Sequence, residues 1–152
     1  MSDYGEMKWS VRVSARDQSS VAVYARKKRF DVGSPLAFDV EEEGTSAFEY
    51  MLGAIGADLV AGMKELCHRR RLEVDNVEAF VVGELDNPLA HLGVVGEEGH
   101  PGLSNLAVKV FVETLEEEDD IRKVWDEMLE RSPLYRTFSS LARFDMRLQI
   151  AM

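Results

Sequence analysis

Cysteine is almost absent from this sequence, because Cys67 is the only one among 152 residues. A single thiol excludes an intramolecular disulfide and a cysteine-rich metal centre. Histidine is scarce as well, with three residues in the chain. Two of them, His91 and His100, enclose Glu97 and Glu98, but this spacing matches no common metal-ligand pattern. We therefore predict an exposed loop at this place, no metal site and no cofactor.

Positive charge is in deficit. Lys and Arg number 18 against 28 Asp and Glu, which gives a formal net charge of -10. Binding to nucleic acid or to an anionic membrane needs clustered Lys and Arg, so the charge argues against both as partners. The one basic run is HRRRLE, residues 68–73, and cations in such a run suit the carboxyl end of a helix.

A long hydrophobic run is missing too. The longest apolar stretch is MLGAIGADLVAGM, residues 51–63, which Asp58 interrupts and Lys64 follows. It is too short to cross a bilayer. The first ten residues, MSDYGEMKWS, contain no apolar segment of the kind that a signal peptide needs. We predict a cytoplasmic protein without a membrane segment.

Alternating apolar and polar residues predict several strands. In MKWSVRVSA, residues 7–15, the side chains of Trp9, Val11 and Val13 share one side. Two further strands are predicted within residues 21–33, and single strands over residues 74–87, 103–115 and 143–152. Residues 88–102 form a connection that is long for a hairpin, and the sequence assigns it no role.

Three helices are predicted. Residues 116–131, EEEDDIRKVWDEMLER, have an amphipathic pattern with an acidic first turn. Ser132 followed by Pro133 predicts the cap and first residue of a short helix. The longest helix is expected from Ala47 to about Arg71, opened by a capping box in SAFE, residues 46–49.

Small residues in the long helix predict tight packing. Glycine costs about 1 kcal/mol relative to alanine inside a helix, so the glycines indicate close approach of another backbone. They are Gly53, Gly56 and Gly62, and a stripe repeating every four residues contains Gly53, Ala57 and Ala61. The element order predicts one α+β domain over residues 1–152, with an antiparallel sheet against one long helix.

Asp58 stands out within the apolar helix. A buried carboxylate costs several kcal/mol unless a partner compensates it or its pKa rises, so we expect an arginine partner. Cys67 lies nine residues further along, which places it on the opposite side of the helix. Its neighbour His68 does not face it, because adjacent helical residues diverge. We predict that Cys67 is inert.

The segment TSAFEYMLGAIGADLVAGMKELCHRRRLEVDNVEAFVVGEL, with LAVKVFVETL and RSPLYRTF after it, resembles the OsmC/Ohr family. These are osmotically induced and organic hydroperoxide resistance proteins, and the resemblance covers roughly residues 28–150. It implies antiparallel sheets wrapped around a central helix at residues 46–71, and an intertwined homodimer. The N-terminal strands, residues 1–32, would be exchanged between subunits, and residues 74–152 would form the second α+β half.

The resemblance also implies a site. In active members a thiolate on the central helix attacks a peroxide, and a cysteine just before a proline resolves it by forming a disulfide. A glutamate and an arginine hold the thiolate. Glu49 matches the glutamate, and Arg29, or else Arg26, matches the arginine. Asp58 and Ser132 occupy the two cysteine positions, so the chain resembles a divergent member that lacks both catalytic cysteines.

The leading hypothesis is an OsmC-like dimer without thiol peroxidase activity that retains an interface pocket for a small apolar ligand. A carboxylate cannot become a sulfenic acid, and a serine cannot resolve one. An enzyme stays open as an alternative, either a residual hydroperoxide reductase through Cys67 or acid–base chemistry by Asp58 with Glu49. A structural or regulatory dimer that binds another protein is the third reading.

Overall fold

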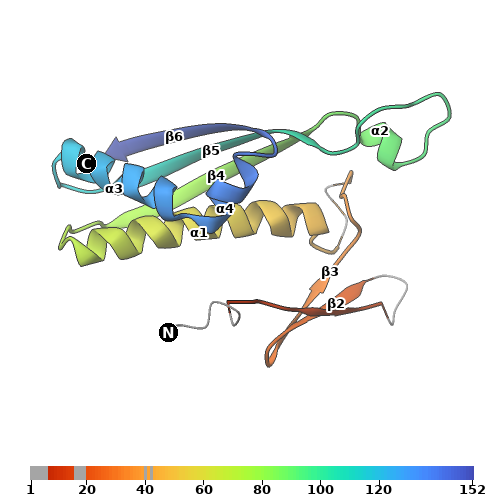
Figure 1. Ribbon diagram of the computed structural model, residues 1–152, viewed down its shortest axis with the longest axis horizontal. Coiled ribbons are helices and arrows are strands. Elements are labelled where there is room, and N and C mark those ends of the chain that lie inside the picture. Colours follow the sequence, from red (N-terminus) through yellow and green to blue (C-terminus); the bar gives the residue numbers. More distant parts are fainter. Residues whose placement is uncertain (1–6, 16–19, 40, 42) are drawn as a thin grey trace. The chain divides into compact units, whose positions relative to one another are not determined.

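The computed structural model describes residues 7–15, 20–39, 41 and 43–152 (Figure 1). The chain divides into two compact units, Met1–Met51 and Leu52–Met152, and each is described by itself. Within the described residues, none of the helices combines the length and the apolarity that a membrane span requires.

The first unit contains a three-stranded antiparallel sheet. Its strands are β1 (Arg12–Ser14), β2 (Val21–Ala25) and β3 (Lys28–Val32), in the order β1-β2-β3. The prediction of three strands is confirmed, but β1 is much shorter than the expected strand over residues 7–15. Arg12 pairs with Tyr24, one residue before β2 ends. Val11 would lie opposite Ala25, the last residue of β2, and residues 7–10 extend beyond the strand that could pair with them.

The second unit contains the long helix and a second sheet (Figure 1). Helix α1 (Ala47–Arg69) begins in the first unit and continues into the second. It is followed by β4 (Asn76–Leu85), α2 (Pro88–His91), β5 (Leu103–Glu113), α3 (Glu118–Arg131), α4 (Pro133–Phe138) and β6 (Arg143–Ala151). The predicted α+β fold class is confirmed.

The second sheet has the strand order β4-β5-β6 and is mixed. Strands β4 and β5 are antiparallel, as expected, whereas β6 runs parallel to β5. The connection between β5 and β6 holds α3 and α4, and a helical crossover of this length returns the chain in the same direction. Helices α1, α3 and α4 lie on one face of this sheet (Figure 1).

The core of the second unit lies between this face and the helices. Ile55, Leu59 and Met63 recur every four residues on α1 and are fully buried. The alternating residues of β5 are buried on the same face: Leu106, Val108, Val110 and Val112. Helix α3 adds Ile121, Val124, Trp125 and Met128. This core fixes α1 against α3, which decides the geometry of the site.

Gly56 and Gly62 of α1 make room for side chains rather than for a backbone of the same chain, and the close approach of a second copy stays a prediction. A Cβ atom on Gly56 would lie 3.0 Å from Val81 Cγ2, and one on Gly62 would lie 2.9 Å from Met128 Cγ. A Cβ atom on Gly53 would have no neighbour within 4 Å. The predicted small-residue stripe is exposed to solvent in the part of the chain that the structure describes. Its residues are Gly53, Ala57 and Ala61.

Both ends of α1 have specific caps. The predicted capping box is confirmed, because Glu49 N–H donates to Ser46 Oγ (3.1 Å) and Ser46 N–H donates to Glu49 Oε1 (3.0 Å). At the other end Leu72 N–H donates to the Cys67 carbonyl (2.9 Å), and Arg71 has a φ of 57°. This is a Schellman motif in which Arg71 takes the left-handed position that glycine favours.

Helix α2 was not predicted from the sequence. It occupies the first part of the long connection at residues 88–102 and spans Pro88–His91. Asn87 caps it, since its side chain accepts a hydrogen bond from Leu89 N–H (3.2 Å). A helix of four residues is too short to produce an apolar periodicity.

Candidate functional site

Asp58 and Ser132 meet where α1 passes the junction of α3 and α4. Ser132 ends α3 and caps α4, with its N–H donating to the Met128 carbonyl (2.8 Å). Its Oγ accepts a hydrogen bond from Tyr135 N–H (3.0 Å) and donates its own proton to Asp58 Oδ2. Ser132 is buried and Asp58 is half-buried. The two positions matched to the family cysteines therefore contact each other.

This contact gives Asp58 a hydrogen-bond partner within the second unit. A hydroxyl that donates to a carboxylate offsets part of the cost of removing that carboxylate from water. The partner expected from the sequence was an arginine, whereas the second unit supplies a serine. The pairing of the two positions had a signal in the sequence, because the resemblance implies a disulfide between them.

A cavity of about 260 Å³ adjoins this pair. Six of its lining residues come from one face of α1, at Asp58, Ala61, Gly62, Glu65, Leu66 and Arg69, and four from α3 and α4, at Met128, Arg131, Ser132 and Pro133. The α1 set has the spacing i, i+3, i+4, i+7, i+8 and i+11, which defines one helix face. Glu65 and Arg69 were not predicted from the sequence, although this helical spacing from Asp58 could have identified them.

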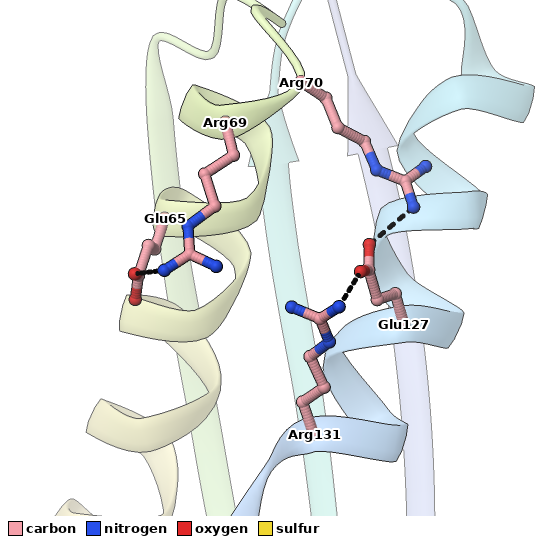
Figure 2. Close-up of polar contacts among 5 residues, drawn as sticks. All are labelled: Glu65, Arg69, Arg70, Glu127 and Arg131. Atoms are coloured by element: carbon pink, nitrogen blue, oxygen red, sulfur yellow. Dashed lines mark hydrogen bonds and ion pairs between the residues drawn. The ribbon is translucent and has the colours of Figure 1, made fainter.

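Two arginines, Arg69 and Arg131, line this cavity, and Figure 2 shows their guanidinium groups and ion pairs. Arg69 reaches back along α1 and pairs with Glu65 (2.7 Å), while Arg131 reaches back along α3 and pairs with Glu127 (2.8 Å). Arg70 pairs with Glu127 from the other side. Arg69 and Arg131 side chains are 62% and 59% exposed, so their ion pairs contribute about 0–1 kcal/mol each. Both retain donors that are free to bind another group.

Glu49 is engaged in the capping box of α1, within the first unit. Hydrogen bonds with the backbone N–H of Ser46 and with its side chain lower the pKa of the Glu49 carboxyl group. Glu49 is therefore ionised at neutral pH and is unsuited to act as a general acid there. Its pairing with Asp58 in acid–base chemistry stays a prediction.

The two candidate arginines also lie in the first unit. Arg29 Nη2 contacts Asp31 Oδ1 at 3.1 Å, and the hydrogen bond and charge of Asp31 raise the pKa of Arg29. Its guanidinium lies 5.7 Å from the centre of the Tyr24 ring. Arg26 is in the turn between β2 and β3, with a left-handed φ of 56°. The match of either arginine to the family arginine stays a prediction.

Cys67 is poorly placed for nucleophilic chemistry. Its side chain is only 1% exposed, and burial raises its pKa, an effect that nearby Arg70 opposes and Glu116 reinforces. Since the thiolate is the nucleophile, a buried thiol with a raised pKa reacts slowly. This supports the prediction that Cys67 is inert.

His91 ends α2 and His100 lies in the loop after it, and both are exposed. Across the part of the chain that the structure describes, no group of three or more His, Cys, Asp or Glu side chains is arranged to hold a metal ion.

Comparisons with known proteins identify related folds. A family model described as OsmC-like protein matches residues 40–147. An OsmC-like protein from Mycoplasma pneumoniae has a TM-score of 0.79 at 14% identity, over 97% of this chain and 99% of that one. An OsmC-like protein of unknown function from Vibrio cholerae has a TM-score of 0.71 at 12% identity, over 93% and 98%. The organic hydroperoxide resistance protein OhrB of Bacillus subtilis has a TM-score of 0.59 at 15% identity, over 93% and 98%. No curated protein matches the chain.

Proposed function

Because this chain belongs to the OsmC-like protein family, we propose that it is a relative of the hydroperoxide resistance proteins that has lost thiol peroxidase chemistry and binds a small ligand instead. The observation that carries the proposal is the hydrogen bond from Ser132 to Asp58. It joins the two positions at which the resemblance expects the cysteines, and neither side chain can be oxidised and reduced as a thiol is.

The only thiol in the chain gives no substitute. Cys67 is buried and its pKa is raised, and no second cysteine exists to resolve a sulfenic acid. A peroxide that oxidised Cys67 would leave it dependent on an external thiol for every turnover. These facts support a protein that serves stress defence by binding a ligand rather than by reducing hydroperoxides.

The cavity beside Asp58 supports retention of a ligand. Ala61, Leu66, Met128 and Pro133 supply apolar lining, and ligand pockets are mostly apolar with a few placed polar groups. We assign this cavity to the small ligand with an apolar part. We also propose a cytoplasmic homodimer, in which the exposed stripe at Gly53, Ala57 and Ala61 is covered by a second copy.

A peroxidase assay tests the loss of activity. Purified protein with dithiothreitol should consume cumene hydroperoxide and tert-butyl hydroperoxide no faster than the Cys67→Ser variant does. Turnover that disappears in Cys67→Ser would overturn the proposal and establish the residual reductase. Light scattering at micromolar concentration tests the assembly, and a monomer there would contradict the dimer.

A further inference from the structure

We propose that the cavity between α1 and the α3–α4 junction binds a short zwitterion, with its anionic group at Arg69 and Arg131 and its ammonium group at Asp58. This inference rests on the proposed ligand-binding function and names the chemical class of the ligand. It follows from the distribution of charge along the cavity, from its length and from its volume.

The charges of the lining are separated along α1. Asp58 and Ser132 lie at one end, while Arg69 lies eleven residues further along the helix, a rise of roughly 16 Å. Arg69 points back toward Glu65, and Arg131 extends from the last turn of α3 away from Ser132, so the two guanidinium groups approach each other from opposite sides (Figure 2). Because Arg69 folds back toward Glu65, its guanidinium group lies nearer to Asp58 than the separation of the two backbone positions.

The guanidinium end is suited to an anion. Two positive side chains line the same cavity, and each has one partner, Glu65 for Arg69 and Glu127 for Arg131. A guanidinium has five N–H donors, so both can donate further hydrogen bonds to a carboxylate placed between them.

The opposite end is suited to a donor. Ser132 donates to Asp58 Oδ2, and within the second unit no further hydrogen bond to this carboxylate is described. The remaining oxygen can accept a hydrogen bond from an ammonium group, and charge–charge attraction strengthens such a bond. A monoanion with an apolar tail would instead bring that tail against the Asp58 carboxylate and remove it from water without compensation.

The middle of the cavity and its size limit the rest of the ligand. Ala61, Gly62, Leu66 and Met128 supply apolar lining, and the one other carboxylate of the lining, Glu65, is paired with Arg69. The connecting atoms of the ligand should therefore be apolar. A volume of about 260 Å³ is slightly below the usual range of ligand pockets, about 300–1,000 Å³, so the ligand should be small. A linear ω-amino acid of about six carbons combines the two end groups with a short apolar chain.

Matched probes of one chain length test this class. We would titrate 15N-labelled full-length protein with 6-aminohexanoate, hexanoate, hexylamine and hexanol, and follow amide shifts around Gly62 and Ser132. In the wild-type protein 6-aminohexanoate should bind most tightly. In Arg69→Gln/Arg131→Gln, 6-aminohexanoate and hexanoate should each weaken about tenfold, because charge-assisted hydrogen bonds are lost, whereas hexylamine should not weaken.

Two further variants complete the test. Asp58→Asn should weaken 6-aminohexanoate and hexylamine and leave hexanoate unchanged. Arg122→Gln is the matched control, since Arg122 makes the same i,i+4 pair on α3, with Glu118, but does not line the cavity. It should bind every probe as the wild-type protein does, and thermal melts should show that each variant is folded.

The outcomes separate this inference from the proposed function. Unchanged affinity of 6-aminohexanoate in the double arginine variant would overturn the zwitterion. Equal binding of hexanol and 6-aminohexanoate in the cavity would also overturn it, while the proposed apolar ligand would stand. If no probe shifts the amides around Gly62 and Ser132, both the zwitterion and the assignment of this cavity fail. The peroxidase assay decides the loss of thiol chemistry independently.

Discussion

The contact between Asp58 and Ser132 should appear as a coupling energy when both residues are replaced by alanine, singly and together. A hydrogen bond to a charged group contributes about 1.5–3 kcal/mol, so Asp58→Ala should lower the free energy of unfolding by that amount. Ser132→Ala also removes the acceptor of Tyr135 N–H, and loss of such a cap costs about 1 kcal/mol more. The double variant loses the shared bond once, which predicts a coupling energy of about 1–3 kcal/mol.

Urea-induced unfolding followed by circular dichroism measures these values from the midpoint and the slope. Asp58→Asn keeps a carbonyl oxygen that can accept the hydroxyl proton, so its stability should lie between those of the wild type and Asp58→Ala. A control cycle uses Ser140, whose exposed hydroxyl donates to the Thr137 carbonyl (2.9 Å) and not to Asp58. The pair Asp58→Ala and Ser140→Ala should be additive.

A coupling energy below about 0.5 kcal/mol would refute the contact, since distant sites add within that margin. The arginine hypothesis predicts a different result. Removing Asp58 from a buried ion pair leaves an unpaired charge and costs about 3–5 kcal/mol. A cost of that size that persists unchanged in the Ser132→Ala background would therefore favour an arginine partner.

Three further predictions concern single features of the fold. The folded pKa of Glu49 is lowered, so the stabilisation from its charge is present above its unfolded value of about 4.3 and is lost as pH falls through the folded pKa. The melting temperatures of the wild type and Glu49→Gln, measured from pH 7 to pH 3, should differ at pH 7 and converge at low pH, and parallel curves would contradict this. Arg71→Gly should raise the free energy of unfolding by about 1 kcal/mol, because glycine adopts the left-handed conformation at the end of α1 without a steric penalty; a denaturant midpoint that falls would count against the cap. Asp58→Cys/Ser132→Cys should form a disulfide on oxidation, seen as the loss of two free thiols relative to the reduced protein, and two persistent thiols would contradict the correspondence with the family cysteines.

Local sequence signals predicted the secondary structure well. The capping box at Ser46 and Glu49 located the start of α1, and Ser132 before Pro133 located the start of α4. Both helix caps depend on hydrogen bonds between residues three apart in the chain, so a segment of four residues is enough to predict each of them. The alternation of buried residues in β5 is equally local, because successive side chains of a strand face opposite sides.

The direction of β6 relative to β5 could not be predicted from local sequence signals. Its alternating pattern predicts a strand but is the same for parallel and antiparallel pairing. The direction follows from the crossover through α3 and α4, which places Leu106 opposite Phe144 and Val112 opposite Ile150. The shortness of β1 also depends on its partner, because β2 ends before it can pair with residues 7–10.

The sequence proposed candidate site residues but did not predict the contact between two of them. The resemblance identified Asp58 and Ser132, which are 74 residues apart in the chain, and only tertiary packing shows that they share a hydrogen bond. The cavity also depends on tertiary packing. Its α1 residues follow a helical spacing, but Met128 and Arg131 join them only because the core packs α3 against α1.

A hydrogen bond in place of a disulfide changes what this site can do. A disulfide would couple the junction of α1 and α4 to the redox state of its surroundings, since its formation and reduction depend on external thiols. The Ser132 hydroxyl and the Asp58 carboxylate have no such dependence, and the buried Cys67 lines no wall of the cavity. The polar end of the cavity is therefore the same under oxidising and reducing conditions. This independence from redox conditions is the behaviour that we expect of the proposed binding site, in which an arriving donor contacts the Asp58 carboxylate.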